Sequence, residues 1–228
     1  MSMSKPKISI CVPVHKMENW EFFIKRLFRS VFEQSYKDWE LLIAVANEDD
    51  EIRTFLHSTE LPSEYVPFSI VLGAKGMAAN SNAAIKQANG EIVKMLYMDD
   101  YLYDENALQH LIDGWRGGWA ASGCIHNDGV SAYNAHFPKW AEEVYKGVNL
   151  IGSPSVIAFK NDGQTLFDER MSWMLDLDLY RDLYDKYGEP TIINYLDVGI
   201  GTHTGQMTHI LTDAEKQHEV ELFHGKTD

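Results

Sequence analysis

Two adjacent carboxylates, Asp99 and Asp100, follow an apolar run in this sequence of 228 residues. The run, residues 92–98, has the composition of a buried strand and is interrupted by Lys94, whose long side chain we expect to reach solvent. Two anions side by side at the end of a strand repel each other unless a cation or hydrogen-bond donors offset them. The pair therefore indicates a divalent-metal site. The alternative is that Asp100 begins a helix near Asp104.

Asp176 is a candidate proton acceptor. Residues 172–187 predict a helix, with Ser172 as its cap, in which apolar and aromatic side chains recur at every third or fourth position. Asp176 lies at the edge of this stripe, where burial raises the pKa of an unpaired carboxylate, whereas Asp178 is expected to face water. The alternative is an aspartate of the first helical turn, favoured there by the helix dipole.

His203 is the third candidate for chemistry. The sequence contains 9 scattered histidines, and a single histidine is more often structural or exposed than a ligand. His203 differs because Gly201 and Gly205 flank it in a segment that could fold over a site. We therefore consider it a candidate contact to a metal or a phosphate.

The composition narrows the classes of function. A net charge of -14 without a lysine or arginine cluster excludes a broad nucleic-acid-binding face. Cys11 and Cys124 both lie in apolar runs, which predicts free buried thiols and fits a reducing compartment. The sequence has neither a secretory pattern nor an apolar run of roughly 20 residues, so we expect no transmembrane segment and a cytoplasmic location.

The first hundred residues alternate between strand and helix patterns. The expected strands are 8–14, 40–46, 68–72 and 92–98, and the expected helices are 19–34, 50–58 and 80–88. This alternation predicts a Rossmann-like, doubly wound parallel sheet whose ligands bind at the carboxyl ends of the strands. Residues 13–16, 47–50 and 99–100 would meet at that edge, which strengthens the case for a metal site.

The remaining residues lack this regular alternation. We predict helices at 104–115, 139–146 and 172–187, strands at 119–126, 155–160 and 192–196, and loops at 127–138 and 199–209. No internal repeat or linker separates the two parts. We therefore expect one domain, 1–228, with a nucleotide-sugar half (about 1–101) and an acceptor half (about 102–228) on the same sheet.

Several stretches follow the order and spacing of a known family, from Ile8 to about Thr208. The segment 9–15 is similar to that family's opening strand, and 30–43 is similar to its Ser-x-x-x-Gln-Thr-Tyr-x-Asp-x-Glu signature. Ahead of Asp99-Asp100, which correspond to the family's metal motif, further matches are Gly76, Asn82, Ala88, Gly90 and Glu91. The sequence thus resembles the family 2 glycosyltransferases, which have the GT-A fold.

The resemblance implies an α/β fold with a central, mostly parallel sheet flanked by helices. It also implies an inverting, metal-dependent transferase of the hexosyltransferase type, which moves a sugar from a nucleotide-diphospho-sugar, a UDP-sugar by preference, to a saccharide or other hydroxyl acceptor. Asp100 would hold Mn or Mg at the donor diphosphate, and Asp99 would contact the metal or the ribose. Asp176 would be the catalytic base. The nucleotide-sugar-binding positions would include Pro13, His15, Asn47 and Asn82.

Three departures from the family pattern leave alternatives open. Asn47 replaces an aspartate that contacts the base, Tyr97 replaces the first aspartate of the longer metal motif, and Leu175 replaces the glutamate before the catalytic base. A non-catalytic nucleotide- or sugar-binding module of the same fold is therefore the main alternative. A nucleotidyltransferase fits less well, because residues 12–17 contain no glycine for a phosphate loop.

Overall fold

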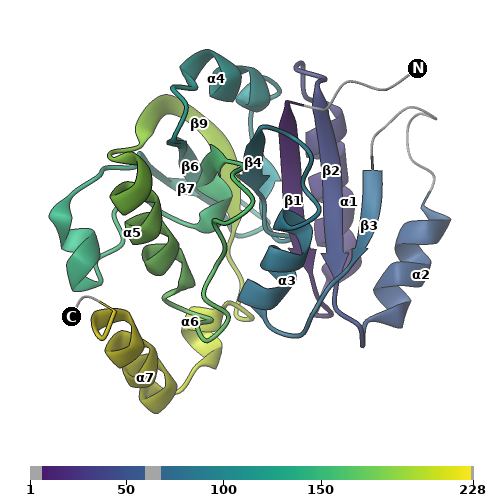
Figure 1. Cartoon of the computed structure of the whole chain (residues 1–228). Helices are drawn as coiled ribbons and strands as arrows, with labels where there is room; N and C mark the ends of the chain where they lie inside the picture. The colour runs from purple at the N-terminus through teal and green to yellow at the C-terminus, as the bar shows by residue number, and fades with distance from the viewer. Residues whose placement is uncertain (1–6, 60–67, 227–228) are drawn as a thin grey trace.

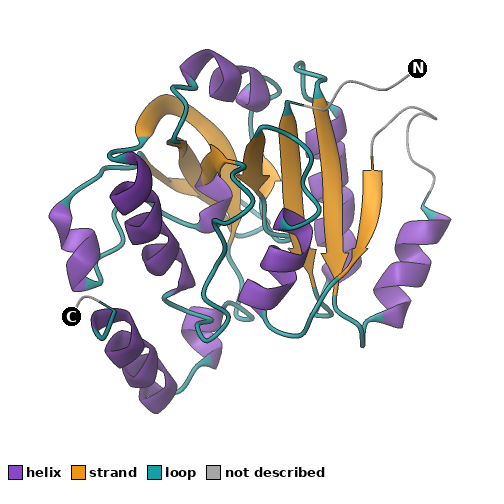
Figure 2. Ribbon diagram, viewed as in Figure 1, coloured by secondary structure: helices purple, strands orange, loops and turns teal. Residues whose placement is uncertain are grey.

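A computed structural model describes residues 7–59 and 68–226 of the chain. In this part a nine-stranded sheet runs through the molecule, with helices on both of its faces (Figures 1 and 2). The strand order is β3-β2-β1-β4-β8-β6-β9-β5, and β7 pairs with β6. The mixed α/β architecture predicted from the sequence is confirmed.

The first part of the sheet is parallel, as predicted. The chain forms β1 (Ile8–Val14), β2 (Trp39–Val45), β3 (Phe68–Leu72) and β4 (Ile92–Met95), and β1 lies between β2 and β4. The connecting helices are α1 (Trp20–Phe32), α2 (Asp50–Ser58) and α3 (Met77–Ile85). The helix predicted at 80–88 instead begins at Met77, directly after Gly76, whose φ of 96° turns the chain into it.

Alternating side chains of the strands build a core on each face of the sheet. Ile8, Ile10 and Val12 of β1 belong to the core that contains α1 and α2, whereas Cys11 belongs to the core that contains α3. This alternation follows from the two-residue period of a strand. Cys11 and Cys124 are both buried and free, as predicted.

The second part of the sheet mixes strand directions. Antiparallel pairs join β4 to β8 (Ile157–Lys160), β8 to β6 (Trp119–Asn127), β6 to β7 (Ala132–His136) and β9 (Thr191–Gly201) to β5 (Tyr101–Leu102), while β6 and β9 are parallel. The other elements are α4 (Ala107–Gly114), η1 (Glu142–Lys146), η2 (Pro154–Val156), α5 (Leu175–Tyr187), α6 (Met207–Ile210) and α7 (Asp213–His224). None of the helices in the described part is long and apolar enough to cross a membrane.

Several predicted boundaries in this part were wrong. Residues 132–136 were expected to be loop but pair with β6, and β9 continues to Gly201 because its end pairs with both β6 and β5. The helix expected to start after Ser172 starts at Leu175 instead, and Met174 is its cap residue.

Lys94 does not reach solvent, contrary to the prediction. Its side chain is 5% exposed, and its ammonium group donates to the backbone carbonyls of Ser155 and Met95. Burial lowers the pKa of Lys94 to about 8. The strand before the two aspartates therefore contains a buried, hydrogen-bonded amine.

Gly90 allows β1 and the start of β4 to approach closely. A Cβ atom at this position would lie 2.7 Å from the backbone nitrogen of Ser9 and 2.9 Å from the carbonyl carbon of Ile8. Gly90→Ala is therefore expected to lower the free energy of unfolding by roughly 1–3 kcal/mol, measured by urea denaturation. In Gly225→Ala, where the nearest atom would be 3.2 Å away, the change should stay within about 0.5 kcal/mol. Equal losses in the two variants would contradict this account.

Candidate active site

The carboxyl ends of the parallel strands form one wall of a cavity of about 320 Å³. Pro13 and His15 follow β1, and Ala46, Glu48 and Asp49 follow β2. The loop before α3 adds its residues 74–76. The first cavity is therefore built where a doubly wound sheet binds its ligands.

A second cavity, of about 380 Å³, adjoins the first. His15, Tyr97 and Asp99 line both cavities. The second cavity also contains Asp100, Asp176 and His203 in its walls. The structure thus brings together the adjacent Asp99 and Asp100 with Asp176 and His203, which lie far from them in the sequence.

Asp99 lies in the turn between β4 and β5. Its carboxylate oxygen Oδ2 is 2.9 Å from Nε2 of His203, and its backbone carbonyl accepts a hydrogen bond from Arg26. The backbone N–H of Gly205 donates to Nδ1 of His203 at 3.1 Å, so the neutral imidazole carries its proton on Nε2 and donates it to Asp99. A Cβ at Gly201 would lie 2.1 Å from the carbonyl oxygen of Asp99, so only glycine fits there.

Asp100, the residue after Asp99, is buried, with 2% of its surface exposed. Its carboxylate accepts hydrogen bonds from the backbone N–H of Gly201 at 2.9 Å and from the hydroxyl of Ser153 at 3.3 Å. Burial, and secondarily the charge of Asp99, raise the pKa of Asp100 to about 8. Asp100 does not begin a helix, because α4 begins only at Ala107 after its cap residue Asn106.

The donor set fits a divalent cation that takes further ligands from a substrate. Asp99 and Asp100 supply carboxylate oxygens. Both ring nitrogens of His203 already make hydrogen bonds, Nε2 with Asp99 and Nδ1 with the backbone N–H of Gly205, so His203 could join as a ligand only by giving up one of them. Within residues 7–59 and 68–226, however, no three His, Cys, Asp or Glu side chains are close enough to form a complete metal site. Such an open arrangement suits a cation that is held by one or two carboxylates together with phosphate oxygens.

Asp176 is the second residue of α5 and faces the second cavity. Its Oδ1 accepts from the backbone N–H of Leu177 at 2.7 Å, and its Oδ2 accepts from the side-chain amide of Asn149 at 2.6 Å. Burial outweighs these two hydrogen bonds and raises the pKa of Asp176 to about 7. A carboxyl group that titrates near neutral pH inside a cavity is suited to accept a proton. Asp178, expected at the surface, is instead 2% exposed and paired with Arg181 and Lys226.

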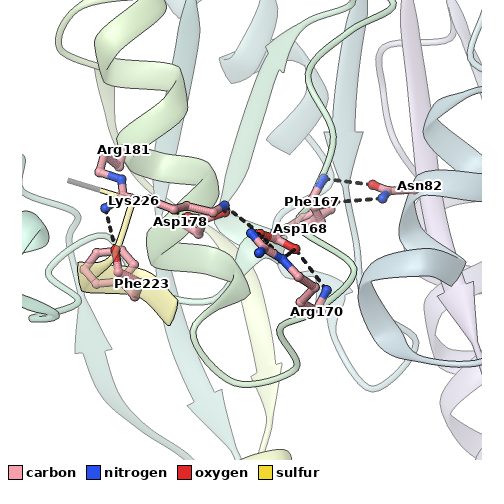
Figure 3. Close-up of polar contacts among 8 residues, drawn as sticks. All are labelled: Asn82, Phe167, Asp168, Arg170, Asp178, Arg181, Phe223 and Lys226. Atoms are coloured by element: carbon pink, nitrogen blue, oxygen red, sulfur yellow. Dashed lines mark hydrogen bonds and ion pairs between the residues drawn. The ribbon is translucent and has the colours of Figure 1, made fainter. Parts of the chain in front are cut away.

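The remaining predicted positions divide into two groups. Pro13 and His15 line the first cavity, as the strand-end argument requires. Asn47 is exposed and is not among the described residues that line either cavity. Asn82 is 1% exposed, and its amide bonds with the backbone N–H and carbonyl of Phe167 (Figure 3). In the described structure Asn82 therefore holds α3 against the segment that leads to α5.

Asp49 is a buried polar group of the first cavity that the sequence argument did not single out. It is 8% exposed and accepts a hydrogen bond from the backbone N–H of Lys16 at 3.2 Å. The acidic turn 47–50 was the available signal, but nothing in the sequence distinguishes its inward carboxylate from its outward ones. In the structure Arg53 donates to the carbonyls of Ala46 and Asn47 and so fixes the conformation of this turn.

Comparisons with known proteins identify the family and support the fold. The sequence profile described as "Glycosyl transferase family 2" matches residues 9–183. Among curated protein sequences no match is found. Similar solved structures include S. aureus TarS 1-349 in complex with UDP-GlcNAc, at a TM-score of 0.72 and 17% identity, covering 95% of this chain and 65% of that chain. Another is the mannosyltransferase PcManGT from Pyrobaculum calidifontis in complex with GDP-Man and Mn2+. Its TM-score is 0.63 and its sequence identity is 14%, and the match covers 99% of this chain and 65% of that chain.

At sequence identities of 14–17% the structural similarity supports the fold alone. This chain also spans less than two thirds of the length of either solved structure. Any activity, substrate or metal of the whole neighbouring proteins therefore needs its own argument for this chain.

Proposed function

The chain belongs to glycosyl transferase family 2 and has the GT-A fold, and we propose that it is an inverting, metal-dependent glycosyltransferase. The observation that carries the proposal is the common cavity of Asp99, Asp100, His203 and Asp176. A cation-binding group and a proton acceptor in adjoining positions are what the transfer of a sugar from a nucleotide-diphospho-sugar requires.

The donor nucleoside is proposed to occupy the first cavity, beside Pro13 and His15. Glu48 and Asp49 of the turn after β2 both line this cavity, and we assign the contact with the base to Asp49, which is 8% exposed and held by the backbone N–H of Lys16. Asn47 lies outside the lining residues. A carboxylate only accepts hydrogen bonds, so it suits the imide N–H of uracil or the N–H edge of guanine. UDP and GDP-Man are bound by the two kinds of neighbour described above, and we favour a UDP-sugar.

Asp99 and Asp100, with His203 beside them, are the proposed holders of Mn or Mg at the donor diphosphate. When bound, the cation would stabilise the negative charge that develops on the leaving nucleoside diphosphate. Gly201 and Ser153 orient the carboxylate of Asp100 through their hydrogen bonds, and Arg26 fixes the backbone at Asp99.

Asp176 is the proposed catalytic base. It would accept the proton of an acceptor hydroxyl while that oxygen forms its bond to the anomeric carbon of the sugar. The bond from this carbon to the diphosphate breaks on the opposite side, so the configuration inverts. The acceptor, a saccharide or another hydroxyl compound, would enter from the half of the chain that contains α5. Two buried free thiols are consistent with action in the cytoplasm.

The base preference tests the donor proposal. In thermal unfolding with MnCl2 and one nucleoside diphosphate at a time, UDP is expected to raise the Tm more than ADP or CDP, whose pairing edges carry an acceptor nitrogen that a carboxylate repels. Asp49→Ala should weaken UDP binding by about tenfold, the value of one hydrogen bond to a charged group. Asn47→Ala is the control and should leave the affinity unchanged. Equal stabilisation by all nucleotides, or by none, would refute the proposal for the donor.

A further inference from the structure

Helix α7 buries a carboxylate as well as an aromatic ring against the rest of the molecule. It begins with a capping box between Thr212 and Glu215, and only Glu219 and Phe223 of the helix are buried. These two residues are one helical turn apart, so they share one face. A helix that docks by its apolar surface alone would not bury a carboxylate there, because an unpaired buried charge costs free energy.

The carboxylate of Glu219 accepts three consecutive backbone N–H groups just before α5. Oε1 accepts from Ser172 at 2.9 Å, and Oε2 accepts from Trp173 at 2.8 Å and from Met174 at 2.9 Å. Met174 is the cap residue of α5 and provides no side-chain hydrogen bond to the helix. Glu219 therefore satisfies backbone donors at the start of a helix that lacks a side-chain cap of its own.

The segment that Glu219 holds is part of the wall of the second cavity. Ser172, Trp173, Leu175 and Asp176 all line it. Since Asp176 lies only two residues after Met174, the backbone geometry at Met174 sets where its carboxylate points. The carboxylate of Asp176 itself bonds to Leu177 in the same turn.

Further contacts keep α7 in place along α5. Arg181 donates to the backbone carbonyl of Phe223 at 2.9 Å (Figure 3). Lys226 pairs with Asp178 at 2.6 Å and with Asp168 at 2.7 Å. The ammonium nitrogen of Lys216 lies 5.8 Å from the ring centre of Trp173. Glu219 thus reaches α5 from a helix that is independently anchored, so its carboxylate can act as a fixed support.

We propose that Glu219 is a positioning residue for sugar transfer: it holds the start of α5 so that Asp176 faces the acceptor. The inference rests on the proposed function, because it assigns Glu219 a task in the reaction of Asp176. It predicts that loss of Glu219 lowers kcat and leaves donor affinity largely unchanged, since Ser172 is the only residue of the held segment 172–174 among the described residues that line the first cavity.

The test compares Glu219→Ala, Glu219→Gln and Glu221→Gln. Glu221 is exposed on the same helix, so its variant is the control for removing one charge. We expect kcat to fall by about 10-fold to 100-fold in Glu219→Ala, with partial retention in Glu219→Gln, whose amide oxygen can still accept hydrogen bonds. The Kd for the nucleotide donor should be unchanged in all three. A kcat within twofold of the control in Glu219→Ala, or a parallel loss of donor affinity, would overturn the proposal.

Amide hydrogen exchange provides a readout that does not depend on activity. The amides of residues 172–174 should exchange faster in both Glu219 variants, while those of residues 180–187 keep their protection. Unchanged protection at 172–174 would overturn the role of Glu219 even if kcat falls. If the unmodified chain transfers no sugar from any donor, the proposed function fails, and the exchange data still decide whether Glu219 holds the start of α5.

Discussion

Asp176→Asn is expected to lower the rate of sugar transfer by about 100-fold to 10,000-fold, the usual contribution of a general base. Donor binding should persist, because the proposed donor contacts lie at the strand ends and in the β4–β5 turn. The loss should therefore appear in kcat, with an unchanged Kd for the nucleotide. Asparagine preserves the size of the side chain, and its single carbonyl oxygen can keep one of the two hydrogen bonds that Asp176 accepts from Leu177 and Asn149.

The pH profile provides a second measurement of the same residue. Since burial raises the pKa of Asp176 to about 7, kcat of the unmodified chain should rise with pH through a midpoint near 7 and then level off. Any residual activity of Asp176→Asn should lack this midpoint. Asp182→Asn, an exposed position on the same helix, should retain both the rate and the profile. A profile that is the same in Asp176→Asn would contradict the assignment.

As the pH rises through 7, the free energy of unfolding should fall while kcat rises. The pKa of Asp176 is raised in the folded chain above its unfolded value near 4, so the folded state binds this proton more tightly. The contribution of this group to stability is complete below about pH 4 and is lost as the pH rises through 7. Asp176→Asn does not titrate, so between pH 4 and pH 8 it should lose less stability than the unmodified chain, by roughly 2–4 kcal/mol.

The regular part of the fold was predictable because its signals are local. The bounds of α2 and β3 were predicted to the residue, since α2 follows an acidic turn and the β3 sequence lies between Pro67 and Gly73. The irregular part was not, because its boundaries depend on pairing partners far away in the chain. β7 is one example: four of its five side chains are exposed, so it has no apolar alternation, and its strand geometry comes from pairing with β6.

The same distinction applies to the site. Asp99, Asp100 and Asp176 could be selected because their chemistry and their neighbours in the sequence are informative. The buried position of Lys94 could not be predicted, because the carbonyl of Ser155 that accepts its hydrogen bond is 61 residues away. Glu219 was missed for the same reason: its three backbone donors lie 45–47 residues earlier, and no period in α7 marks it as buried.

Asp100→Asn is expected to abolish the additional stabilisation that MnCl2 gives to the chain in the presence of a nucleoside diphosphate. For the unmodified chain, a nucleotide at 100 times its Kd should add about 2.7 kcal/mol and raise the Tm by roughly 5–10 °C. Removal of one carboxylate should weaken cation-dependent binding by at least about 100-fold, because it removes a charged ligand from a site that has only two carboxylates. EDTA should have the same effect on the unmodified chain.

The variant itself should remain folded, which makes the loss interpretable. Asp100 is buried next to Asp99, and its pKa of about 8 keeps its carboxyl mostly protonated near neutral pH, so the amide replaces a group that is already largely neutral. The hydroxyl of Ser153 can rotate to accept a hydrogen bond from the new amide. The Tm without ligands should therefore not fall by more than a few degrees. Asp113→Asn, an exposed aspartate of α4, is the matched control and should keep the full nucleotide response.

Two outcomes would separate the metal role from a merely structural one. If Asp100→Asn responds to MnCl2 and UDP like the control, then Asp100 does not hold the cation and the metal-dependent proposal fails. If it loses the response to MnCl2 but UDP alone still stabilises both chains equally, the nucleoside contacts at the strand ends act independently of the cation. The second result is the one we expect, because the described residues that line the first cavity include Asp49 and His15 but not Asp100.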